Sequence, residues 1–300
     1  MNDFNLNFGS DPEVFAVLER TGEVISPALL EEFSGVSPVI QDKYHPIFID
    51  NKEFSWHMDG VAFELTVKKI LKTGKDFVDT FQNSLDSLDS FLSNVSFQGN
   101  TLSLFTKPVV PINKELYLPY VIEDTPTFND KIFQGFIFGC DEDFDAVDVN
   151  YKCKTKSFLD DSFRYGGGHF HVSGNPLFAE YPEVSIVFLA MTIGNYFVIK
   201  AKERELNKKR VETFGKPFRF RPTKYSDGNY GVEYRSLSNS IMLFEESEFE
   251  QMILLSNKAS EFLTNKRVDI YEQFLNPTAE AIINYDSNLA NKILKELLQK

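Results

Sequence analysis

The stretch "YGGGHFHVSGN" (residues 165–175) decides the fold, because it places two of the chain's four histidines one residue apart in a strand-like segment. Successive side chains of a strand point to opposite faces, so His169 and His171 share one face while Phe170 and Val172 share the other. The glycines before them indicate a turn. The segment therefore predicts a strand with one polar and one apolar face.

Four other strand-like segments divide their side chains in the same way. They are "GSDPEVFAVL" (9–18) with Asp11 and Glu13, "DGVAFELTV" (59–67) with Glu64, "FRFRPTKY" (218–225) with Arg219 and Arg221, and "GVEYRSL" (231–237) with Glu233 and Arg235. A solvent-facing antiparallel sheet also alternates polar and apolar residues. Its polar positions, however, are usually Lys, Thr, Ser and Gln rather than Glu, His and Arg. We therefore expect these segments to be strands of one curved, mainly antiparallel sheet with the charged side chains on its concave face.

Helical periodicity predicts four helices that would cover the other face of the sheet. They span residues 74–94, 184–199 (with Pro182 in the first turn), 245–263 and 276–298. Residues 105–130 contain four prolines and little periodicity, which predicts a long connecting loop or an insertion. The expected architecture is α+β, with residues 1–300 forming a single catalytic domain.

Composition limits the partners. The 300 residues are 42% hydrophobic and 25% charged, as in an ordinary globular protein, and the net charge of -13 disfavours nucleic acid and anionic membranes. The start "MNDFNLNFGSDPEVF" has no signal-peptide pattern, and the apolar run 184–199 is shorter than a bilayer span. Cys140 and Cys153 form no disulfide framework or metal-binding CxxC pair. We expect a cytoplasmic protein with no nucleic-acid or membrane partner.

The residue types on the predicted polar face indicate their chemistry. Carboxylates and imidazoles on facing strands form a ligand set for Mg²⁺ or Mn²⁺, and nearby arginines suit phosphate oxygens because the guanidinium fork binds two at a time. The chain has no GxxxxGK[ST], GxGxxG, HExxH or GxSxG motif. Carboxylates flanked by arginines also fit a zinc-dependent hydrolase less well than an enzyme that acts on a magnesium-bound nucleotide. Metal, carboxylates and arginines together predict phosphoryl chemistry.

The segments "GSDPEVF", "DGVAFEL", "GGGHFHV" and "GVEYRSLSN", in this order, resemble the carboxylate-amine ligases (amidoligases, COOH-NH2 ligase type 2) that tailed phages often encode. That family belongs to the glutamine synthetase and glutamate-cysteine ligase superfamily. The resemblance extends from about residue 8 to residue 239. It implies a fold like the glutamine synthetase catalytic domain, ATP as cofactor, and Mg²⁺ or Mn²⁺.

The same resemblance implies roles for individual residues. The metal ligands would be Glu13, Glu64, His169, Glu233 and Asp11. His171 would lie at the nucleotide phosphates or the metal, and the transferring phosphate would be held by Arg219, Arg221 and Arg235. Glutamine synthetases usually have Glu where this chain has Asp11, which implies a weaker or more distant ligand. The chain also has no room for their separate N-terminal domain, so the site should lie within one chain.

The implied reaction is ATP-dependent formation of an amide or peptide bond through an acyl phosphate. The partners would be a small-molecule or peptide carboxylate and an amine, in the cytoplasm of the host if a phage encodes the protein. Asp59 and Asp11 are the candidates for the base that deprotonates the amine. Two alternatives stay open: transfer of phosphate to a guanidino or other acceptor, and a non-catalytic phage protein that binds nucleotide or metal.

Four remaining features are expected to be structural or exposed. His45 has no identifiable partner. His57, two residues before Asp59, is a candidate for supporting a metal ligand, but an ordinary structural histidine is the favoured interpretation. The basic run 200–210 is expected to be a solvated helix end, where cations are favoured by the helix dipole. The acidic run 140–148 is expected to be an exposed loop.

Overall fold

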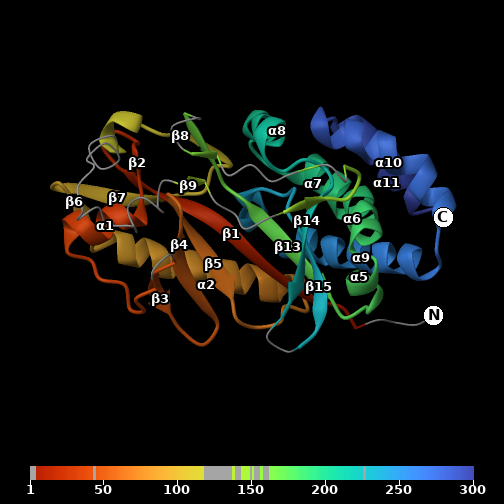
Figure 1. The fold of residues 1–300 in the computed structure, drawn as a ribbon, viewed down its shortest axis with the longest axis horizontal. Helices are drawn as coiled ribbons and strands as arrows, with labels where there is room; N and C mark the ends of the chain where they lie inside the picture. Colours follow the sequence, from red (N-terminus) through yellow and green to blue (C-terminus); the bar gives the residue numbers. More distant parts are fainter. Residues whose placement is uncertain are drawn as a thin grey trace.

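The structure, a computed structural model, describes residues 5–42, 45–117, 137–138, 143–148, 151, 156–157, 162–225 and 228–300. It is an α+β protein with a mostly antiparallel sheet and helices, as the sequence predicts. Every strand pair among the described residues is antiparallel. Figure 1 shows the strands crossing the middle of the molecule and most of the C-terminal helices gathered at one end.

Within the described residues the main sheet has eleven strands, eight of which form the continuous order β10-β14-β15-β13-β1-β5-β4-β3. These are β10 (Phe144–Asp145), β14 (Arg219–Lys224), β15 (Tyr230–Tyr234), β13 (Gly168–Ser173), β1 (Asn7–Leu18), β5 (Ala62–Val67), β4 (Phe54–Asp59) and β3 (Ile47–Asp50). The long strand β1 connects the two halves of the main sheet. It pairs with β13 through residues 7–12, with β5 at residues 13–14 and with another strand, β7, through residues 15–18.

Shorter strands complete the β structure. In the main sheet, β2 (Val24–Ile25) and β7 (Asn100–Phe105) pair with β1, and β6 (Ser96–Phe97) pairs with β7. Two separate two-stranded sheets join β8 (Val109–Pro111) to β12 (Phe163–Tyr165) and β9 (Ile137–Phe138) to β11 (Lys156–Ser157). Strand β8 and a helical turn at 114–117 occupy the first part of the predicted loop 105–130, and the rest of that loop lies outside the described residues.

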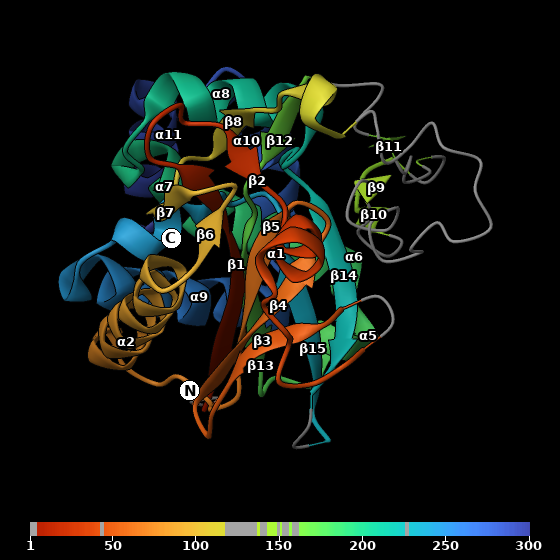
Figure 2. The same ribbon diagram turned by 90° about the vertical axis from the view of Figure 1, so that its left-hand side faces the viewer.

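Three of the four predicted helices form close to the expected bounds, the fourth is divided in two, and further helices form outside the predicted ranges. They are α1 (Pro27–Ser34), α2 (Gly74–Ser93), α5 (Leu177–Glu180), α6 (Pro182–Leu189), the π-helical segment η1 (Ala190–Gly194), α7 (Asn195–Lys200), α8 (Arg204–Thr213), the 3₁₀ turn η2 (Asn239–Leu243), α9 (Glu246–Thr264), α10 (Val268–Ile283) and α11 (Ser287–Leu297). In Figure 2, α2 and α9 lie on the same side of strands β1, β4 and β5.

Phenylalanines join this helix layer to the sheet. Phe77 of α2 stacks on Phe170 of β13 with ring centroids 5.7 Å apart and on Phe249 of α9 at 4.5 Å. All three rings are buried. Phe170 therefore faces the helices, which leaves His169 and His171 on the opposite face, as the alternation in "HFH" predicts.

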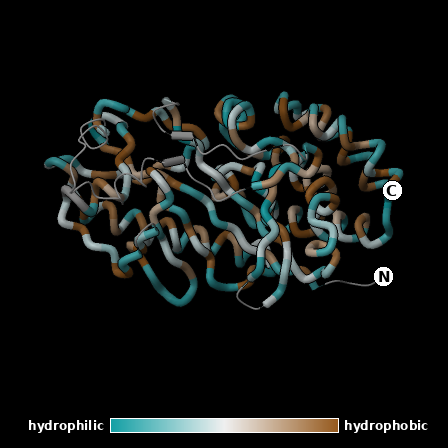
Figure 3. Tube along the Cα trace, in the orientation of Figure 1, coloured by the Kyte–Doolittle hydropathy of each residue, from teal (hydrophilic) through white to brown (hydrophobic). Residues whose placement is uncertain are grey.

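The apolar run 184–199 forms the centre of one helix that starts with Pro182 at its first position and continues through η1 to Lys200. This helix is long and apolar enough to cross a membrane, but 78% of its apolar window is buried inside the protein, as in a core helix. Brown, hydrophobic segments gather around α6 and α7 in Figure 3, where this helix runs.

The prediction of a single helix over 276–298 is wrong, because the chain breaks between α10 and α11. Tyr285 has a left-handed backbone with a φ of 53°, which ends α10. Asp286 then caps α11 by accepting hydrogen bonds from the backbone N–H groups of Asn288 and Leu289. The turn chemistry of "NYDSN" therefore outweighs the continuous apolar pattern.

Candidate functional site

Strand register brings the predicted site residues together on one face of the sheet. Directly opposite residues of an antiparallel pair share a face. The opposed pairs are His57 with Glu64, Glu64 with Glu13, Asp11 with His169, His171 with Glu233, Glu233 with Arg221, and Asp145 with Arg219. Asp59 and Arg235 share the parity of His57 and Glu233, respectively. We call this set the polar row, and it crosses seven strands from β4 to β10.

Asp11 lies at the centre of the polar row. Its Oδ1 is 3.2 Å from His169 Nδ1 and 3.1 Å from His171 Nε2, and His169 Nδ1 is 3.1 Å from Glu233 Oε1. Yet Asp11 Oδ1, His169 Nδ1 and His171 Nε2 are buried and have no hydrogen-bond partner of acceptable geometry in the described part of the chain. Lone-pair atoms that converge in this way suit a cation bound between them.

Three overlapping groups of the polar row have ligand atoms within 4.8 Å of one another. They are Asp11, Glu64 and His169; Asp11, His171 and Glu233; and Glu13, Asp59 and Glu64. Asp11 and Glu64 each belong to two of these groups, so the three groups form one continuous candidate metal site. Six of these seven residues lie inside predicted strands, and Asp59, the first residue of the predicted segment 59–67, is the last residue of β4. The oxygen-rich set fits Mg²⁺ or Mn²⁺ better than a thiol-preferring metal.

The glycine triplet 166–168 is required by close approach to the rest of the site. A Cβ on Gly166 would lie 2.3 Å from Asn239 Nδ2, one on Gly167 2.6 Å from His169 Nε2, and one on Gly168 2.0 Å from Ser238 O. The N–H of Gly167 also donates to the carboxylate of buried Glu13 at 2.9 Å. The triplet therefore lets the strand with the histidines, the turn after β15 and Glu13 meet.

Glu64 and Asp59 form the end of the polar row on β5 and β4. His57 Nε2 lies 2.9 Å from Glu64 Oε2, so His57 contacts a candidate metal ligand rather than being only a structural histidine. Asp59 is buried, and its Oδ2 lies 3.7 Å from Nη2 of Arg164, a buried arginine on β12 that sequence analysis did not single out. Arg164 directly precedes the "YGGGHFH" stretch.

His45 also has a partner. Its Nδ1 lies 3.2 Å from the carbonyl oxygen of Met58, and its ring meets the ring of His57 edge to face with centroids 6.1 Å apart. The contact places His45 beside the histidine that touches Glu64. Nothing in the local sequence signals this pairing, because it depends on the approach of the chain before β3 to β4.

Three arginines flank the other end of the polar row. Arg235 Nη1 contacts Glu233 Oε1, and Arg221 Nη1 lies 3.6 Å from Glu233 Oε2. Arg219 Nε lies 3.4 Å from Asp145 Oδ2. Asp145 belongs to the acidic run 140–148, so the described part of that run is attached to the sheet at this point rather than being wholly an exposed loop. The guanidinium groups bring positive charge to one end of the row, as a phosphate site requires.

The electrostatics favour ionised carboxylates in the middle of the row. Burial acts to raise the pKa of Asp11, but the neighbouring His171 and His169 outweigh it and hold the pKa well below its usual range. Burial likewise acts to raise the pKa of Glu233, and Arg235 outweighs it, so the pKa is lowered. Asp59 differs, because burial and then Glu64 raise its pKa more than Arg164 lowers it. Asp59 is therefore the carboxylate of the three most ready to accept a proton.

A buried polar network holds the chain after β15 in place. Arg210 of α8 donates to the carbonyl oxygens of Ser236 at 2.8 Å and Arg235 at 3.4 Å, and Asn207 bonds to the hydroxyls of Ser238 and Ser240. The expectation that 200–210 is only a solvated helix end is therefore wrong for these two side chains. Asn207 and Arg210 are three residues apart in a helix, which is the one sequence signal that they share a face.

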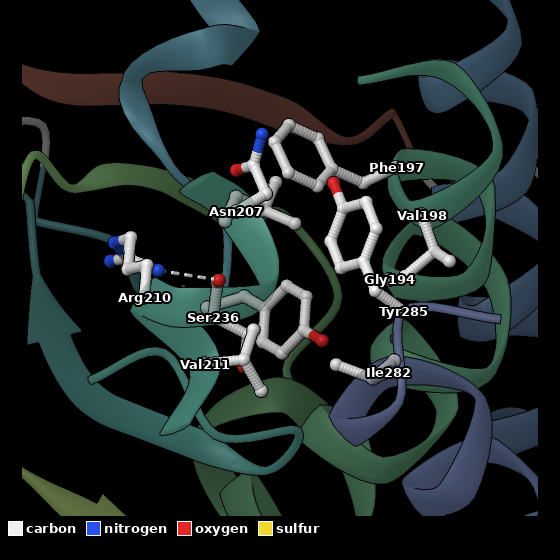
Figure 4. Close-up of a pocket in the computed structure, with 11 residues that line it drawn as sticks. Gly194, Phe197, Val198, Asn207, Arg210, Val211, Ser236, Ile282 and Tyr285 are labelled. Atoms are coloured by element: carbon white, nitrogen blue, oxygen red, sulfur yellow. Dashed lines mark hydrogen bonds between the residues drawn. The ribbon is translucent and has the colours of Figure 1, made fainter. Parts of the chain in front are cut away.

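A small cavity lies behind β15, on the helix side of the sheet. Figure 4 shows it between α8, α7 and the end of α10, with Arg210 bonded to Ser236 at its edge. It has room for about one water molecule. The hydroxyls of Tyr234 and Tyr285, which line it, have no hydrogen-bond partner in the described residues. The cavity is separate from the polar row.

Comparisons of the chain with protein-family models, with curated proteins and with solved structures gave no significant match.

Proposed function

We propose that the polar row is the active site of an ATP- and Mg²⁺- or Mn²⁺-dependent carboxylate-amine ligase, built on the concave face of a glutamine synthetase-like sheet. The observation that carries the proposal is the convergence of Asp11, His169, His171 and Glu233 with no hydrogen-bond geometry between Asp11 and the two imidazoles. Carboxylates and imidazoles at one end and three arginines at the other match a metal–nucleotide site in charge and in residue type. The ordered resemblance to amidoligases agrees with this assignment.

The residues of the row fit the divalent cations that this reaction uses. Glu13, Glu64, Asp11, His169 and Glu233 are the ligands in this proposal, and His171 faces the phosphates or a cation. Bound Mg²⁺ would neutralise negative charge on the β- and γ-phosphate oxygens of ATP. The ionised state of Asp11 and Glu233, favoured by their lowered pKa values, suits that role.

Arg219, Arg221 and Arg235 act on the transferring phosphate. An oxygen of the substrate carboxylate attacks the γ-phosphorus of ATP, and the bond from that phosphorus to the bridging oxygen of the β-phosphate breaks. ADP departs, and the substrate carboxylate becomes an acyl phosphate. The amine then attacks the acyl carbon and inorganic phosphate departs, which forms the amide. The three guanidinium groups stabilise the phosphate oxygens in both steps, so catalysis is mainly positioning and electrostatics.

Asp59 is the base that we favour for the incoming amine. It must take a proton from the ammonium group before attack. Its raised pKa makes it a better proton acceptor than Asp11, whose pKa is lowered. Both substrates are proposed to be small molecules or peptides in the cytoplasm.

Oxygen-18 tracing tests the proposal. The protein would be incubated with ATP, Mg²⁺ and metabolite or peptide extracts of producing cells, with carboxylates labelled with ¹⁸O. An acyl-phosphate route transfers one ¹⁸O from the carboxylate to inorganic phosphate, and mass spectrometry would detect a new amide. A product that carries a phosphoryl group would instead establish a phosphotransferase. Magnesium-dependent ATP binding with no ATP consumption in any extract would favour a non-catalytic binding protein.

A further inference from the structure

Arg219 and Arg221 point to the same face of β14 but have different surroundings. The side chain of Arg221 is 27% exposed and reaches Glu233 within the polar row. The side chain of Arg219 is 9% exposed and contacts Asp145, whose side chain is 10% exposed. Asp145, which lies outside the four amidoligase-like motifs, therefore helps to enclose the side chain of Arg219. The side chain of Arg221 is more accessible.

Two contacts fix the guanidinium group of Arg219. Asp145 lies opposite it in the β10–β14 register, with Oδ2 3.4 Å from Arg219 Nε. The Cζ atom of Arg219 lies over the ring of Tyr151, 2.9 Å from its centroid. One contact is made at Nε and the other at Cζ, so together they restrict the position of the group.

Asp145 is itself held by its own turn. Its Oδ1 accepts hydrogen bonds from the backbone N–H groups of Val147 at 3.0 Å and Asp148 at 3.1 Å, which leaves Oδ2 directed at Arg219. An aspartate that bonds the backbone two and three residues ahead stabilises a turn. The carboxylate therefore links the fold of this segment to the position of the arginine.

The remaining edge of Arg219 suits an anion. Its Nη1 is buried and has no hydrogen-bond partner among the residues that the structure describes. A buried guanidinium N–H without an acceptor is unfavourable, and a phosphate oxygen would satisfy it with a charge-assisted hydrogen bond. With Nε on Asp145 and Cζ over the ring of Tyr151, the Nη1 nitrogen is left for a ligand.

We propose that Asp145 and Tyr151 are positioning residues that hold Arg219 for the γ-phosphate of ATP, and so make the site prefer MgATP to MgADP. The inference rests on the proposed function. Neither residue would touch the nucleotide. Because the guanidinium group is fixed before binding, less side-chain freedom is lost when the phosphate arrives.

Calorimetric titration with MgATP and with MgADP tests this positioning role. Asp145→Asn keeps an oxygen for the turn and the size of the side chain but removes the charge that faces Arg219. We expect the ratio of the MgADP and MgATP dissociation constants to fall about tenfold, with MgADP affinity nearly unchanged. Tyr151→Leu should lower the same ratio. Asp79→Asn, which removes the same charge from a pair with Lys75 on α2, is the matched control and should leave the ratio at the wild-type value.

A double variant separates positioning from a general loss of structure. If Asp145 acts through Arg219, adding Asp145→Asn to Arg219→Lys should not lower the ratio further. A general structural defect would instead weaken MgADP and MgATP alike, and that result, or an unchanged ratio in Asp145→Asn, would overturn the inference while the proposed function stands. Failure of the wild-type protein to bind MgATP at all would overturn the proposed function, and this inference with it.

Discussion

The two faces of the main sheet are built from the same strands but are stabilised in opposite ways. On one face, Phe170 packs on Phe77 and the helix layer, and burial of apolar surface supplies the stability. On the other, Asp11, His169 and Glu233 bury charged or polar groups that approach one another without complete hydrogen bonding. Burial of such groups costs free energy unless they are paired or bind a cation. The comparison indicates that the helix face stabilises the fold, whereas the polar face has a role other than stabilising the fold.

Phe77→Ala should have the largest effect and should act on stability alone. Phe77 is fully buried between Phe170 and Phe249, so the cavity left behind should lower the free energy of unfolding by about 3–5 kcal/mol. Urea denaturation would measure it. Phe144→Ala, at an exposed phenylalanine, is the control and should cost far less. A loss below about 1 kcal/mol for Phe77→Ala would show that the helix face does not carry the fold.

Glu233→Gln should reduce stability as well as function, which distinguishes Glu233 from the rest of the polar face. The change removes the carboxylate charge that buried Arg235 contacts, and breaking a buried ion pair from one side costs roughly 3–5 kcal/mol. Chemical denaturation of the metal-free protein would measure the loss. Adding Arg235→Met should restore much of it, since both charges of the ion pair are then removed. Equal stability of the single and double variants would contradict the pairing.

Glu64→Gln should weaken metal binding and leave the fold nearly unchanged. Glutamine keeps an oxygen for His57, and the side chain of Glu64 is partly accessible, so stability should change by less than about 1 kcal/mol. Loss of a charged ligand should reduce Mn²⁺ affinity by at least about tenfold. Isothermal titration with Mn²⁺ would measure it, with Glu53→Gln, an exposed glutamate paired with Lys69, as control. Identical affinities in all three proteins would remove Glu64 from the ligand set.

The two faces should also respond differently to pH. Burial lowers the pKa of His171 and His57, but Asp11 and Glu64, respectively, outweigh it, and both pKa values are raised. A raised pKa contributes stability that is complete below the unfolded pKa of about 6.5 and is lost as pH rises through the folded value. The metal-free protein should therefore lose stability above about pH 6.5. Mn²⁺ affinity should rise over the same range, because the metal requires unprotonated imidazole.

Urea unfolding and Mn²⁺ titration across this range would give both trends. Phe77 stacks on Phe170 and Phe249, and none of these side chains titrates. Phe77→Ala should therefore lower the free energy of unfolding at every pH without changing its pH dependence. Stability and Mn²⁺ affinity that rise together with pH would contradict the account of the histidines.

Alternation along each strand was enough to predict which residues share a face. The spacing in "GGGHFHV" and "GVEYRSL" places Glu233, Arg235 and the two histidines correctly relative to Phe170, because the period of two is local to the chain. The pairing of those strands then required only that both apolar faces pack on one helix layer. The sheet class and the apolar helices were therefore predictable without any long-range information.

The parts that could not be predicted depend on contacts between distant segments. The ion pair between Arg164 and Asp59 and the hydrogen bond from Arg210 to the carbonyl oxygen of Ser236 join elements that are not neighbours in the sequence. The break at Tyr285 depends on one left-handed residue that composition does not reveal. Such features follow from tertiary packing, which no local period encodes.

A crystal soaked in Mn²⁺, with an anomalous difference map, tests the central claim most directly. The account predicts manganese peaks on the polar row at about 2.0–2.6 Å from oxygen or nitrogen atoms of Asp11, His169, His171 or Glu233, and at the carboxylates of Glu13 and Glu64. A map with no peak on the polar row, or with manganese only at exposed acidic side chains such as Glu245 and Glu246 at the start of α9, would contradict it.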